Sequence, residues 1–482
     1  MKRFLTFILT AALLLGLALP LTGCSAASRL KRMDETERAA YFYEVVDRTM
    51  NYARSGSFEQ TMVLDATLNG VAYKQTTKAT VTFISERNDV TYLEQAKTTV
   101  DVVGGGTIIY SDSGYTDGMM FSYTKEGKNE TKLKSPTTVE NYSIFRQFQN
   151  ASAPLIAVGK GISETMTCKE NEDGTWTAVY EGFTEAGMVP FMHMLRGVDY
   201  MVTAEHSIAD VRMTIHTDAK LYPISYKIEF IFEENAAADS PVPVVTLNNV
   251  YHGWNNTTLS GSYDLSDFTE VDDLRAVDVF TDALMERSYQ ESGAFEVKVV
   301  TDAKGGGYDN KVTNKQKVTF SCEDGFRFKY DYDQDGYDYK TSYADGEISV
   351  KVYENGKKVH SVEQEMTDAQ ARATVAQLMD PESISAQSIS DVEIVDAEKG
   401  ICRFTLSDAF KNNYKEQYEM SGMTLTAFSG YCEAVLAEGI LTEYRYHMEM
   451  TLRVEGETVK TTVDMTITFT GSTGSTGNGE TV

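Results

Sequence analysis

The chain has 482 residues with 71 acidic and 44 basic side chains, which gives a formal net charge of −27. A nucleic-acid partner is not expected, because phosphate binding requires clustered lysines and arginines. The chain is 42% hydrophobic and contains 28 Tyr and 22 Phe, enough to build substantial cores, and its length favours two or three domains.

The first 23 residues (1–23) are typical of a targeting segment, with two basic residues ahead of an apolar run from Phe4 to Leu19. That run is short for a membrane-spanning helix, which needs about 20 residues. The Leu-Thr-Gly-Cys sequence at 21–24 resembles the lipobox of bacterial lipoproteins. The resemblance implies cleavage before Cys24, lipid on its thiol, and attachment to the extracytoplasmic face of the cell membrane. Residues 24–34 would then form a lipidated tether. An ordinary signal peptide or an uncleaved helix is the alternative.

Four cysteines remain if Cys24 is lipidated: Cys168, Cys322, Cys402 and Cys432. They are far apart and form no CxxC pair, so neither a redox motif nor a zinc site is expected. A disulfide among the last three is compatible with an exported protein. Free buried thiols are the favoured interpretation.

Two short motifs occur twice in the chain, in the same order. Ser-Gly-Ser-Phe-Glu at 55–59 matches Ser-Gly-Ala-Phe-Glu at 292–296. Further on, Tyr-Thr-Asp-Gly at 115–118 matches Tyr-Ala-Asp-Gly at 343–346. The shared order predicts two copies of one domain of roughly 200 residues.

Between these motifs the sequence alternates apolar and polar residues, with Asp-Gly and Asn-Gly turns that are strong signals for hairpins. The predicted strands of the first copy lie at 56–66, 74–85, 91–102, 106–111, 119–123, 208–215 and 224–232. Those of the second copy lie at 311–320, 325–333, 337–343, 347–354, 443–452 and 458–469. An additional stretch at 244–254 is expected to add an edge strand to the first copy. Helical segments are predicted at 39–53 and 277–288, and the stretches 138–162 and 367–384 are expected to be helical or irregular.

The predicted organisation has a first domain at 35–270, a second domain at 271–470 and a disordered tail rich in Gly, Ser and Thr at 471–482. Period-two alternation leaves one apolar face on each sheet, and the helices are the candidates to cover it. The expected fold class is therefore α+β. It consists of two tandem copies of a curved antiparallel sheet, an open half-barrel, with helices covering its concave face.

In its element order, N-terminal helix and Tyr-x-Asp-Gly hairpins, this chain resembles two tandem LolA/LppX-like domains between residues 35 and 469. Members of that group are exported lipid-handling proteins whose helices and unclosed β-barrel enclose an apolar cavity. The resemblance implies such a cavity in each domain, but it identifies no ligand-binding residue. The cluster Met188, Met192 and Met194 suits either an adaptable apolar pocket or ordinary core packing.

The sharpest apparent chemical motif is Asp331–Gly336, which fits the first half of a calcium loop. Its twelfth position is Ser342 instead of Glu and its flanks are predicted strands, so a hairpin is the favoured interpretation. His216 and His447 are interpreted as strand residues, and the sequence contains no HExxH motif and no G-x-S-x-G elbow. No catalytic residue, metal site or cofactor is expected.

The leading functional prediction is a non-enzymatic, surface-anchored lipoprotein that binds a lipid or other apolar ligand in a preformed cavity. The alternative is a structural or protein-interaction module of the cell envelope without a cavity. The expected partners are thus the membrane, an apolar ligand or an envelope protein. A large apolar space between sheet and helices favours the carrier, and a filled space favours the module.

Overall fold

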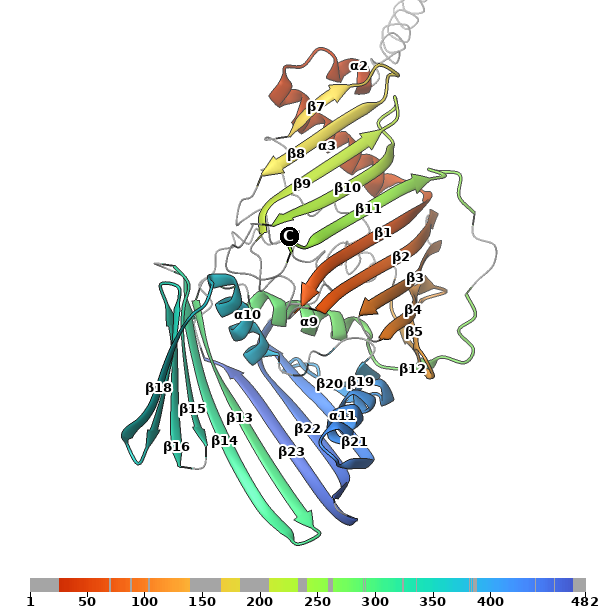
Figure 1. The fold of residues 1–482 in the computed structure, drawn as a ribbon. Coiled ribbons are helices and arrows are strands. Elements are labelled where there is room, and N and C mark those ends of the chain that lie inside the picture. The colour runs from red at the N-terminus through yellow and green to blue at the C-terminus, as the bar shows by residue number, and fades with distance from the viewer. Residues whose placement is uncertain are drawn as a thin grey trace, which may run out of the picture.

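Two large sheets dominate the protein (Figure 1). The computed structural model describes residues 26–68, 71–86, 89–102, 105–138, 166–182, 208–232, 241–258, 263–288, 290, 292–322, 325–334, 336–380, 382, 384, 388–437, 439–454 and 456–470. Five helices are described: α2 (Ala26–Leu30), α3 (Glu35–Tyr52), α9 (Arg275–Ser288), α10 (Asp368–Met379) and α11 (Asp408–Met420).

The first sheet has twelve strands in the order β12-β6-β5-β4-β3-β2-β1-β11-β10-β9-β8-β7. All neighbours are antiparallel except β12 and β6, which run parallel. The strands are β1 (Ser55–Leu68), β2 (Val71–Glu86), β3 (Asp89–Val102), β4 (Gly105–Thr116), β5 (Met119–Glu126), β6 (Asn129–Pro136), β7 (Thr167–Glu170), β8 (Trp176–Gly182), β9 (Ile208–Thr217), β10 (Pro223–Phe232), β11 (Val244–His252) and β12 (Thr269–Glu270).

The second sheet has eleven strands in the order β18-β17-β16-β15-β14-β13-β23-β22-β21-β20-β19. They are β13 (Ser292–Gly305), β14 (Tyr308–Ser321), β15 (Arg327–Gln334), β16 (Tyr337–Ala344), β17 (Glu347–Glu354), β18 (Lys357–Glu365), β19 (Ile389–Asp396), β20 (Ile401–Leu406), β21 (Thr424–Ala437), β22 (Ile440–Val454) and β23 (Glu457–Phe469). Apart from β12, the two sheets repeat one strand order. In each, the first strand pairs with both the second and the last.

The predicted α+β class, with helices covering a concave face, is wrong. The protein is mostly β, and the few described helices contact only part of each sheet: α9 packs on β22, α11 on β21 and α3 on β7. In Figure 1, β13, β14, β22 and β23 extend well beyond α9 and α10. The prediction assumed one apolar face along the whole sheet, whereas every β18 residue except Val362 is exposed. A strand with two solvated faces needs no covering helix.

The expected extra edge strand at 244–254 is also wrong. This stretch forms β11, which lies inside the sheet between β1 and β10 and pairs with both. Its side chains alternate between buried and partly exposed, as suits a strand with one face on the core. The last three strands of the first domain, β9 to β11, therefore correspond to β21 to β23 of the second.

The repeated Tyr-x-Asp-Gly motifs form equivalent hairpin turns. Asp117 and Gly118 have φ angles of 50° and 79°, and Asp345 and Gly346 have 54° and 83°. Two successive positive φ angles are the signature of the type I′ turn that suits the twist of a hairpin. The carbonyl of each turn glycine then accepts a backbone hydrogen bond from the chain that leaves β6 or β18. The predicted hairpins at these motifs are confirmed.

The repeated Ser-Gly-x-Phe-Glu motif has a steric origin. Gly56 lies opposite Phe83, and Gly293 lies opposite Phe320. A Cβ atom at Gly293 would lie 2.6 Å from Phe320 Cζ, and one at Gly56 would lie 2.8 Å from Phe83 Cε1. In both sheets an aromatic ring thus lies across a glycine of the neighbouring strand, a packing that also pins the strand register.

The helices that precede these motifs confirm the predicted helical pattern. Helix α3 begins after Asp34, whose carboxylate accepts a hydrogen bond from the Glu37 amide at 2.9 Å. Ala39, Phe42 and Val46, which recur at helical spacing, are fully buried. Helix α9 buries its apolar face against the second sheet in the same way.

Helix α2 lies within the segment predicted as a tether, and it packs on the body of the protein. Leu30 is fully buried. Arg38 donates to the carbonyls of Leu30 and Met33 at 3.1 and 2.8 Å. Lys31 Nζ lies 2.5 Å from Glu170 Oε1, which joins this segment to β7. The chain is therefore held in the fold from the first described residues.

The linker between the two sheets (residues 263–274) is hydrogen-bonded to both of them. Leu274 donates its amide to the Ser135 hydroxyl of β6 at 3.1 Å. Asp272 donates its amide to the Val392 carbonyl of β19 at 3.1 Å, and its carboxylate accepts from the Ile394 amide at 2.9 Å. One edge of each sheet is therefore occupied by this short segment.

Candidate functional site

Several predicted features lie outside the described residues: the targeting segment 1–23, Cys24, most of the helical segment 138–162, the methionines 188, 192 and 194, and the tail 471–482. Within the described part of the chain, no helix is both long and apolar enough to cross a membrane. The anchor at Cys24 stays a prediction.

The calcium-like segment is a hairpin, which confirms the favoured interpretation. Asp331 and Asp333 lie in β15, opposite Lys340 and Asp338 of β16. His216 and His447 lie in β9 and β22, where they contact Thr177 at 3.0 Å and Asp464 at 2.7 Å. Among the described residues, no group of three or more His, Cys, Asp or Glu side chains is arranged to hold a metal ion.

The four described cysteines are free thiols; Cys168, Cys402 and Cys432 are buried, in agreement with the favoured interpretation, and Cys322 is partly exposed. Burial raises the pKa of the Cys168 thiol to about 12 and also raises the pKa of Cys402 and Cys432. Because the thiolate is the reactive species, these buried thiols stay protonated and inert at neutral pH.

The interiors of the two domains can be compared residue by residue, because the motif phenylalanines Phe58 and Phe295 fix equivalent positions. The strand registers then give three equivalent pairs: Tyr251 and Phe469, Asn249 and Ile467, and Tyr226 and Tyr444. These six residues lie on the central strands of the two sheets, three in each domain. They lie near the helix, α3 or α9, that comes before each sheet in the chain. This is the space in which the sequence predicted a ligand cavity.

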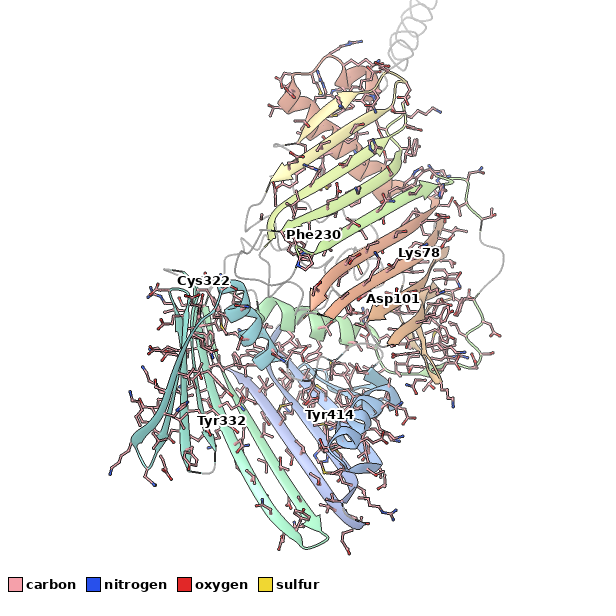
Figure 2. The ribbon with its side chains drawn as sticks, viewed as in Figure 1. Lys78, Asp101, Phe230, Cys322, Tyr332 and Tyr414 are labelled. Carbon is pink, nitrogen blue, oxygen red and sulfur yellow. The ribbon has the colours of Figure 1, made fainter. Side chains whose placement is uncertain are left out.

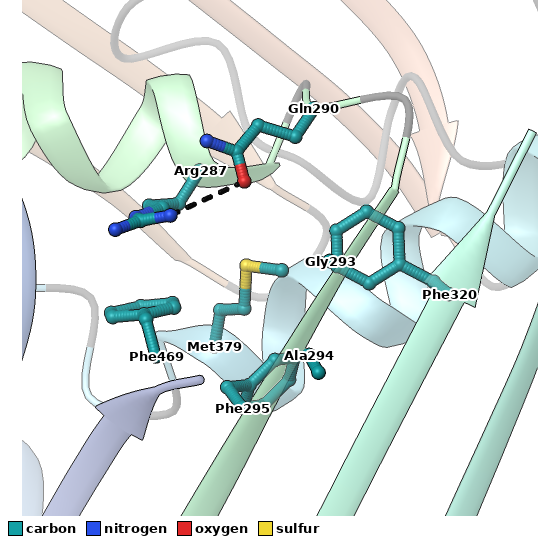
Figure 3. A pocket seen from close by; sticks show the side chains of 8 residues that line it. All are labelled: Arg287, Gln290, Gly293, Ala294, Phe295, Phe320, Met379 and Phe469. Atoms are coloured by element: carbon teal, nitrogen blue, oxygen red, sulfur yellow. Dashed lines mark hydrogen bonds between the residues drawn. The ribbon is translucent and has the colours of Figure 1, made fainter. Parts of the chain in front are cut away.

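In the second domain this space is filled. The Phe280 ring of α9 lies 5.5 Å from Phe404 and 5.6 Å from Tyr444, centroid to centroid. Arg287 caps the gap beside them, donating to the Leu441 carbonyl from Nε at 3.0 Å and Nη2 at 2.8 Å. The remaining gap has no room for a water molecule (Figure 3); it is lined by Arg287, Gln290, Gly293, Ala294, Phe295, Phe320, Met379 and Phe469. Among the described residues, no ligand-sized cavity is present at this place.

The first domain differs at the equivalent place. Asn249 is 0% exposed, and its carboxamide interacts with the Tyr251 hydroxyl but meets no partner at standard hydrogen-bond geometry among the described residues. The hydroxyls of Tyr226 and Tyr251, both buried, likewise lack a partner at standard geometry. Burial raises the pKa of both phenols, and the nearby Asn249 side chain partly offsets the rise at Tyr251. Three polar groups therefore converge inside this apolar core. In the second domain the buried hydroxyls of Tyr444 and Tyr446 also lack a partner at standard geometry, so the difference between the domains is Asn249 against Ile467.

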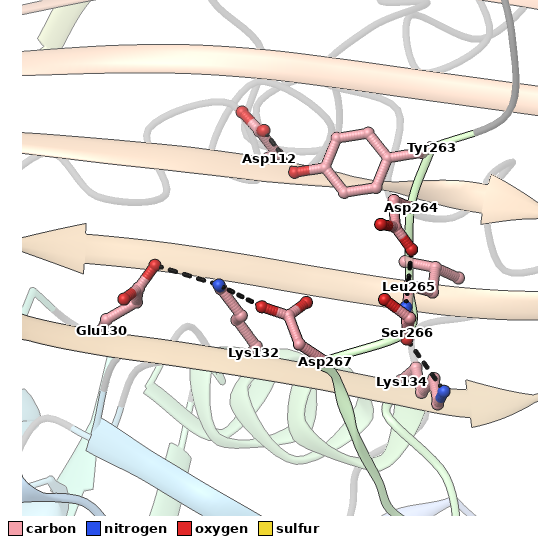
Figure 4. Close-up of polar contacts among 9 residues, drawn as sticks. All are labelled: Asp112, Glu130, Lys132, Lys134, Tyr263, Asp264, Leu265, Ser266 and Asp267. Atoms are coloured by element: carbon pink, nitrogen blue, oxygen red, sulfur yellow. Dashed lines mark hydrogen bonds and ion pairs between the residues drawn. The ribbon is translucent and has the colours of Figure 1, made fainter.

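An open cleft of about 370 Å³ lies where the linker crosses β4 to β6. The Tyr263 ring stacks on Phe121 with 4.6 Å between centroids, and its hydroxyl donates to Asp112 at 2.6 Å. Two lysines of β6 hold the segment beyond it (Figure 4): Lys132 contacts Asp267 at 2.6 Å, and Lys134 donates to the Leu265 carbonyl at 3.0 Å. Since its polar groups bind the linker, this cleft is interpreted as a docking site for the chain itself.

A carboxyl group with a perturbed pKa lies at the side of the second domain. Tyr414 of α11 (Figure 2) donates to Glu382 at 2.7 Å. Burial raises the pKa of Glu382, and the hydrogen bond from Tyr414 partly offsets the rise. The folded protein thus binds this proton more tightly than the unfolded chain. The contribution of Glu382 to stability is greatest below its usual pKa of 4.5 and falls as the pH rises through the raised value.

Glu382→Gln should therefore raise the thermal midpoint at pH 7 by a few degrees and leave it unchanged near pH 4, because glutamine carries no charge to bury. Thermal unfolding at both pH values measures this difference. Glu398→Gln, at an exposed turn, is the matched control and should show no such pH dependence. A Glu382→Gln protein that is less stable than wild type at pH 7 would contradict the expectation.

No protein-family model and no curated protein matches the chain. Among solved structures, it is similar to a DUF1329 family protein from Desulfovibrio piger, with 12% identity and a TM-score of 0.18 over 48% of this chain and 96% of the other. It is also similar to a double mutant of Transferrin Binding Protein B from Haemophilus parasuis, with 6% identity and a TM-score of 0.15 over 87% and 76%. TM-scores this low do not establish a shared fold, and no function follows from these likenesses.

The sequence reading did not single out Asn249, Tyr226 or Tyr251. A signal was available, since asparagine is depleted in strands and Asn249 lies in the middle of the apolar stretch 244–254. The stretch was assigned to a sheet edge, where a polar residue needs no explanation. Its central position in the sheet makes the same residue unusual.

Proposed function

We propose that this protein is a non-enzymatic lipoprotein, anchored through Cys24 on the extracytoplasmic face of the membrane, whose second domain is a packed interaction module of the cell envelope. The filled space beneath α9 carries this proposal, because a carrier needs a preformed cavity at that place. The lipid-binding function predicted for both domains is therefore not proposed for the second.

The exposed strand β18 is the surface proposed for the partner. It lies at the edge of the second sheet, and an edge strand offers free backbone groups to which an extended segment of another protein can add. Its two lysines, Lys357 and Lys358, and the register shift near Val359 discourage indiscriminate pairing. The other edge of the same sheet, β19, is already hydrogen-bonded to the linker.

Photo-crosslinking in intact cells tests the proposal. A benzoylphenylalanine at Val359, which is 52% exposed, should give a discrete protein adduct. The same probe at Ile108 of the first sheet, 43% exposed, is the matched control and should give none. The wild-type chain should fractionate with membranes and carry acyl groups on Cys24, whereas Cys24→Ala should be released together with its adduct.

Two outcomes contradict this function. A Cys24→Ala protein that stays membrane-bound would remove the anchor. Two lipid molecules per chain, found by mass spectrometry of the mature protein purified from residue 25 onward, would restore a carrier role for the second domain.

A further inference from the structure

Three lysines form a row across the first sheet. Lys78 of β2 lies directly opposite Lys97 of β3. Tyr110 of β4 lies opposite both Lys97 and Lys125 of β5. Directly opposed residues of antiparallel strands point to the same face of a sheet. All three lysines are exposed, and Ala79, which points to the other face, is buried. The strand register therefore builds a basic row from lysines that lie far apart in the sequence.

The row has no counter-charge within the fold. In the part of the chain that the structure describes, none of the three lysines forms an ion pair with a carboxylate. Glu130 lies directly opposite Lys125, but its carboxylate contacts Lys132 at 3.3 Å. Asp112, on the adjoining row, accepts a hydrogen bond from the Tyr263 hydroxyl at 2.6 Å. In a chain with 71 acidic and 44 basic side chains, this row is a local reversal of charge.

The row is unfavourable for the folded chain by itself. Like charges at directly opposed positions of antiparallel strands destabilise the pair, and Lys78 and Lys97 occupy such positions. The Nζ atom of Lys97 lies 5.8 Å from the centre of the Tyr110 ring, an interaction that is weak at an exposed site. A bound anion would neutralise the row and remove the repulsion.

The row is too long for one small anion. Neighbouring strands lie about 4.8 Å apart, so the three strand steps from β2 to β5 span roughly 14 Å. The face is also open, since Ile108 and Tyr110 are both 43% exposed on it. A ligand that contacts all three lysines must be extended and must carry several negative charges. A linear polymer with one phosphodiester in each repeat has this chemistry, because lysine binds a phosphate as a point charge.

An anionic membrane surface offers similar phosphate groups, but the proposed anchor at Cys24 places the membrane elsewhere. Helix α2 follows Cys24 in the chain, and Lys31 joins this segment to β7 at the far edge of the sheet. From β7 through β8, β9, β10, β11 and β1 to β2 the distance is roughly 30 Å. Figures 1 and 2 show the same separation between α2 and Lys78. Salt screens exposed charges within about 10 Å at 0.1 M, so the headgroups lie out of reach of the row.

We propose that the exposed face of the first domain binds a linear phosphodiester polymer of the cell envelope through Lys78, Lys97 and Lys125. The inference uses the Cys24 anchor of the proposed function only to place the membrane, and it does not depend on a partner at β18. Because the ligand is not a protein, the crosslinking probe at Ile108 remains a control for protein adducts.

The test is the fluorescence anisotropy of labelled poly(glycerol phosphate) titrated with the mature two-domain chain, from residue 25 onward. For the wild type, the logarithm of the binding constant should fall against the logarithm of the salt concentration with a slope of roughly −2. Three phosphate contacts at about −0.7 each give this slope. A row variant that combines Lys78→Gln, Lys97→Gln and Lys125→Gln should weaken binding by at least about tenfold.

A second triple variant with the same change in net charge is the matched control. Lys304, Lys399 and Lys415 of the second domain each pair with a neighbouring carboxylate. Their combined replacement by glutamine should leave polymer binding close to that of the wild type, because these lysines lie outside the row.

Stability without polymer provides an independent measurement. At low salt Lys97→Gln should keep or raise the thermal midpoint, because it removes the opposed pair of like charges. Added salt should raise the wild-type midpoint more than that of the variant, since only the wild type has this repulsion to screen. Lys74→Gln is the contrast on the same face. It breaks the ion pair with Asp65 at 2.6 Å and should not raise the midpoint.

The proposal is overturned if the wild type does not bind the polymer, or if the control variant binds it as weakly as the row variant. Tighter binding to phosphatidylglycerol vesicles would make the row a membrane contact, and tighter binding to oligothymidylate would make it a nucleic-acid site. A Lys97→Gln protein less stable than the wild type at low salt would show that Lys97 is paired within the fold. These outcomes leave the crosslinking at Val359 and the release of Cys24→Ala untouched, so the two proposals fail separately.

Discussion

Phe280→Ala is expected to lower the free energy of unfolding of the second domain by about 3–5 kcal/mol. Phe280 is fully buried and contacts Phe404 and Tyr444 from α9, so alanine would leave a cavity in a region that now has no room for water. The surrounding rings lie on strands paired on both sides, which limits how far they can move to fill it.

Urea unfolding followed by tyrosine fluorescence and far-UV circular dichroism measures the effect. Val279→Ala is the matched control, because Val279 is the preceding residue on the same helix and is 41% exposed. The control should change the free energy of unfolding by less than about 0.5 kcal/mol. Equal effects of the two substitutions would mean that α9 does not pack as described.

Gly293→Val is expected to destabilise the second domain by about 2–3 kcal/mol. The backbone at Gly293 is extended and accepts any residue, so the loss comes from displacing the Phe320 ring, which lies where the new side chain must go. Gly56→Val should cost a similar amount in the first domain, where Phe83 occupies the same position.

The neighbouring Ser292→Val is the control for this pair, because Ser292 is exposed and faces away from the ring. Its thermal midpoint should stay close to that of the wild type. If Gly293→Val were as stable as Ser292→Val, the shared glycine of the repeated motif would need an explanation other than ring packing.

Local features of the fold were predictable because they depend on neighbouring residues. The Asp117-Gly118 and Asp345-Gly346 turns require positive φ angles that few residue pairs adopt, and the helix before each Ser-Gly-x-Phe-Glu motif shows its spacing directly. The order of the repeated motifs also matches the repeated strand order of the two sheets.

Features that depend on distant parts of the chain were not predictable from these patterns. The central position of β11 arises from its pairing with β1, nearly 200 residues earlier by the register of Phe58 and Tyr251, and no local signal encodes that pairing. Helix coverage failed for a related reason, since the alternation predicted for other strands of the second copy does not reveal that the edge strand β18 is solvated on both faces. Asn249 became notable only when the strand register placed it beside Tyr226. The register also showed that the equivalent residue of the second domain is the aliphatic Ile467.

Helix α2 has a consequence for how the protein would stand on a membrane. Because the fold holds the chain from Ala26 onward, only Ser25 would separate a lipidated Cys24 from a rigid body. Figure 1 shows α2 at one extremity of the molecule and the turn between β13 and β14 at the other. A lipid anchor at Cys24 would therefore leave no flexible tether, and the orientation of the protein relative to the membrane would be restricted. The second domain would meet its partners at a set distance above the lipid headgroups.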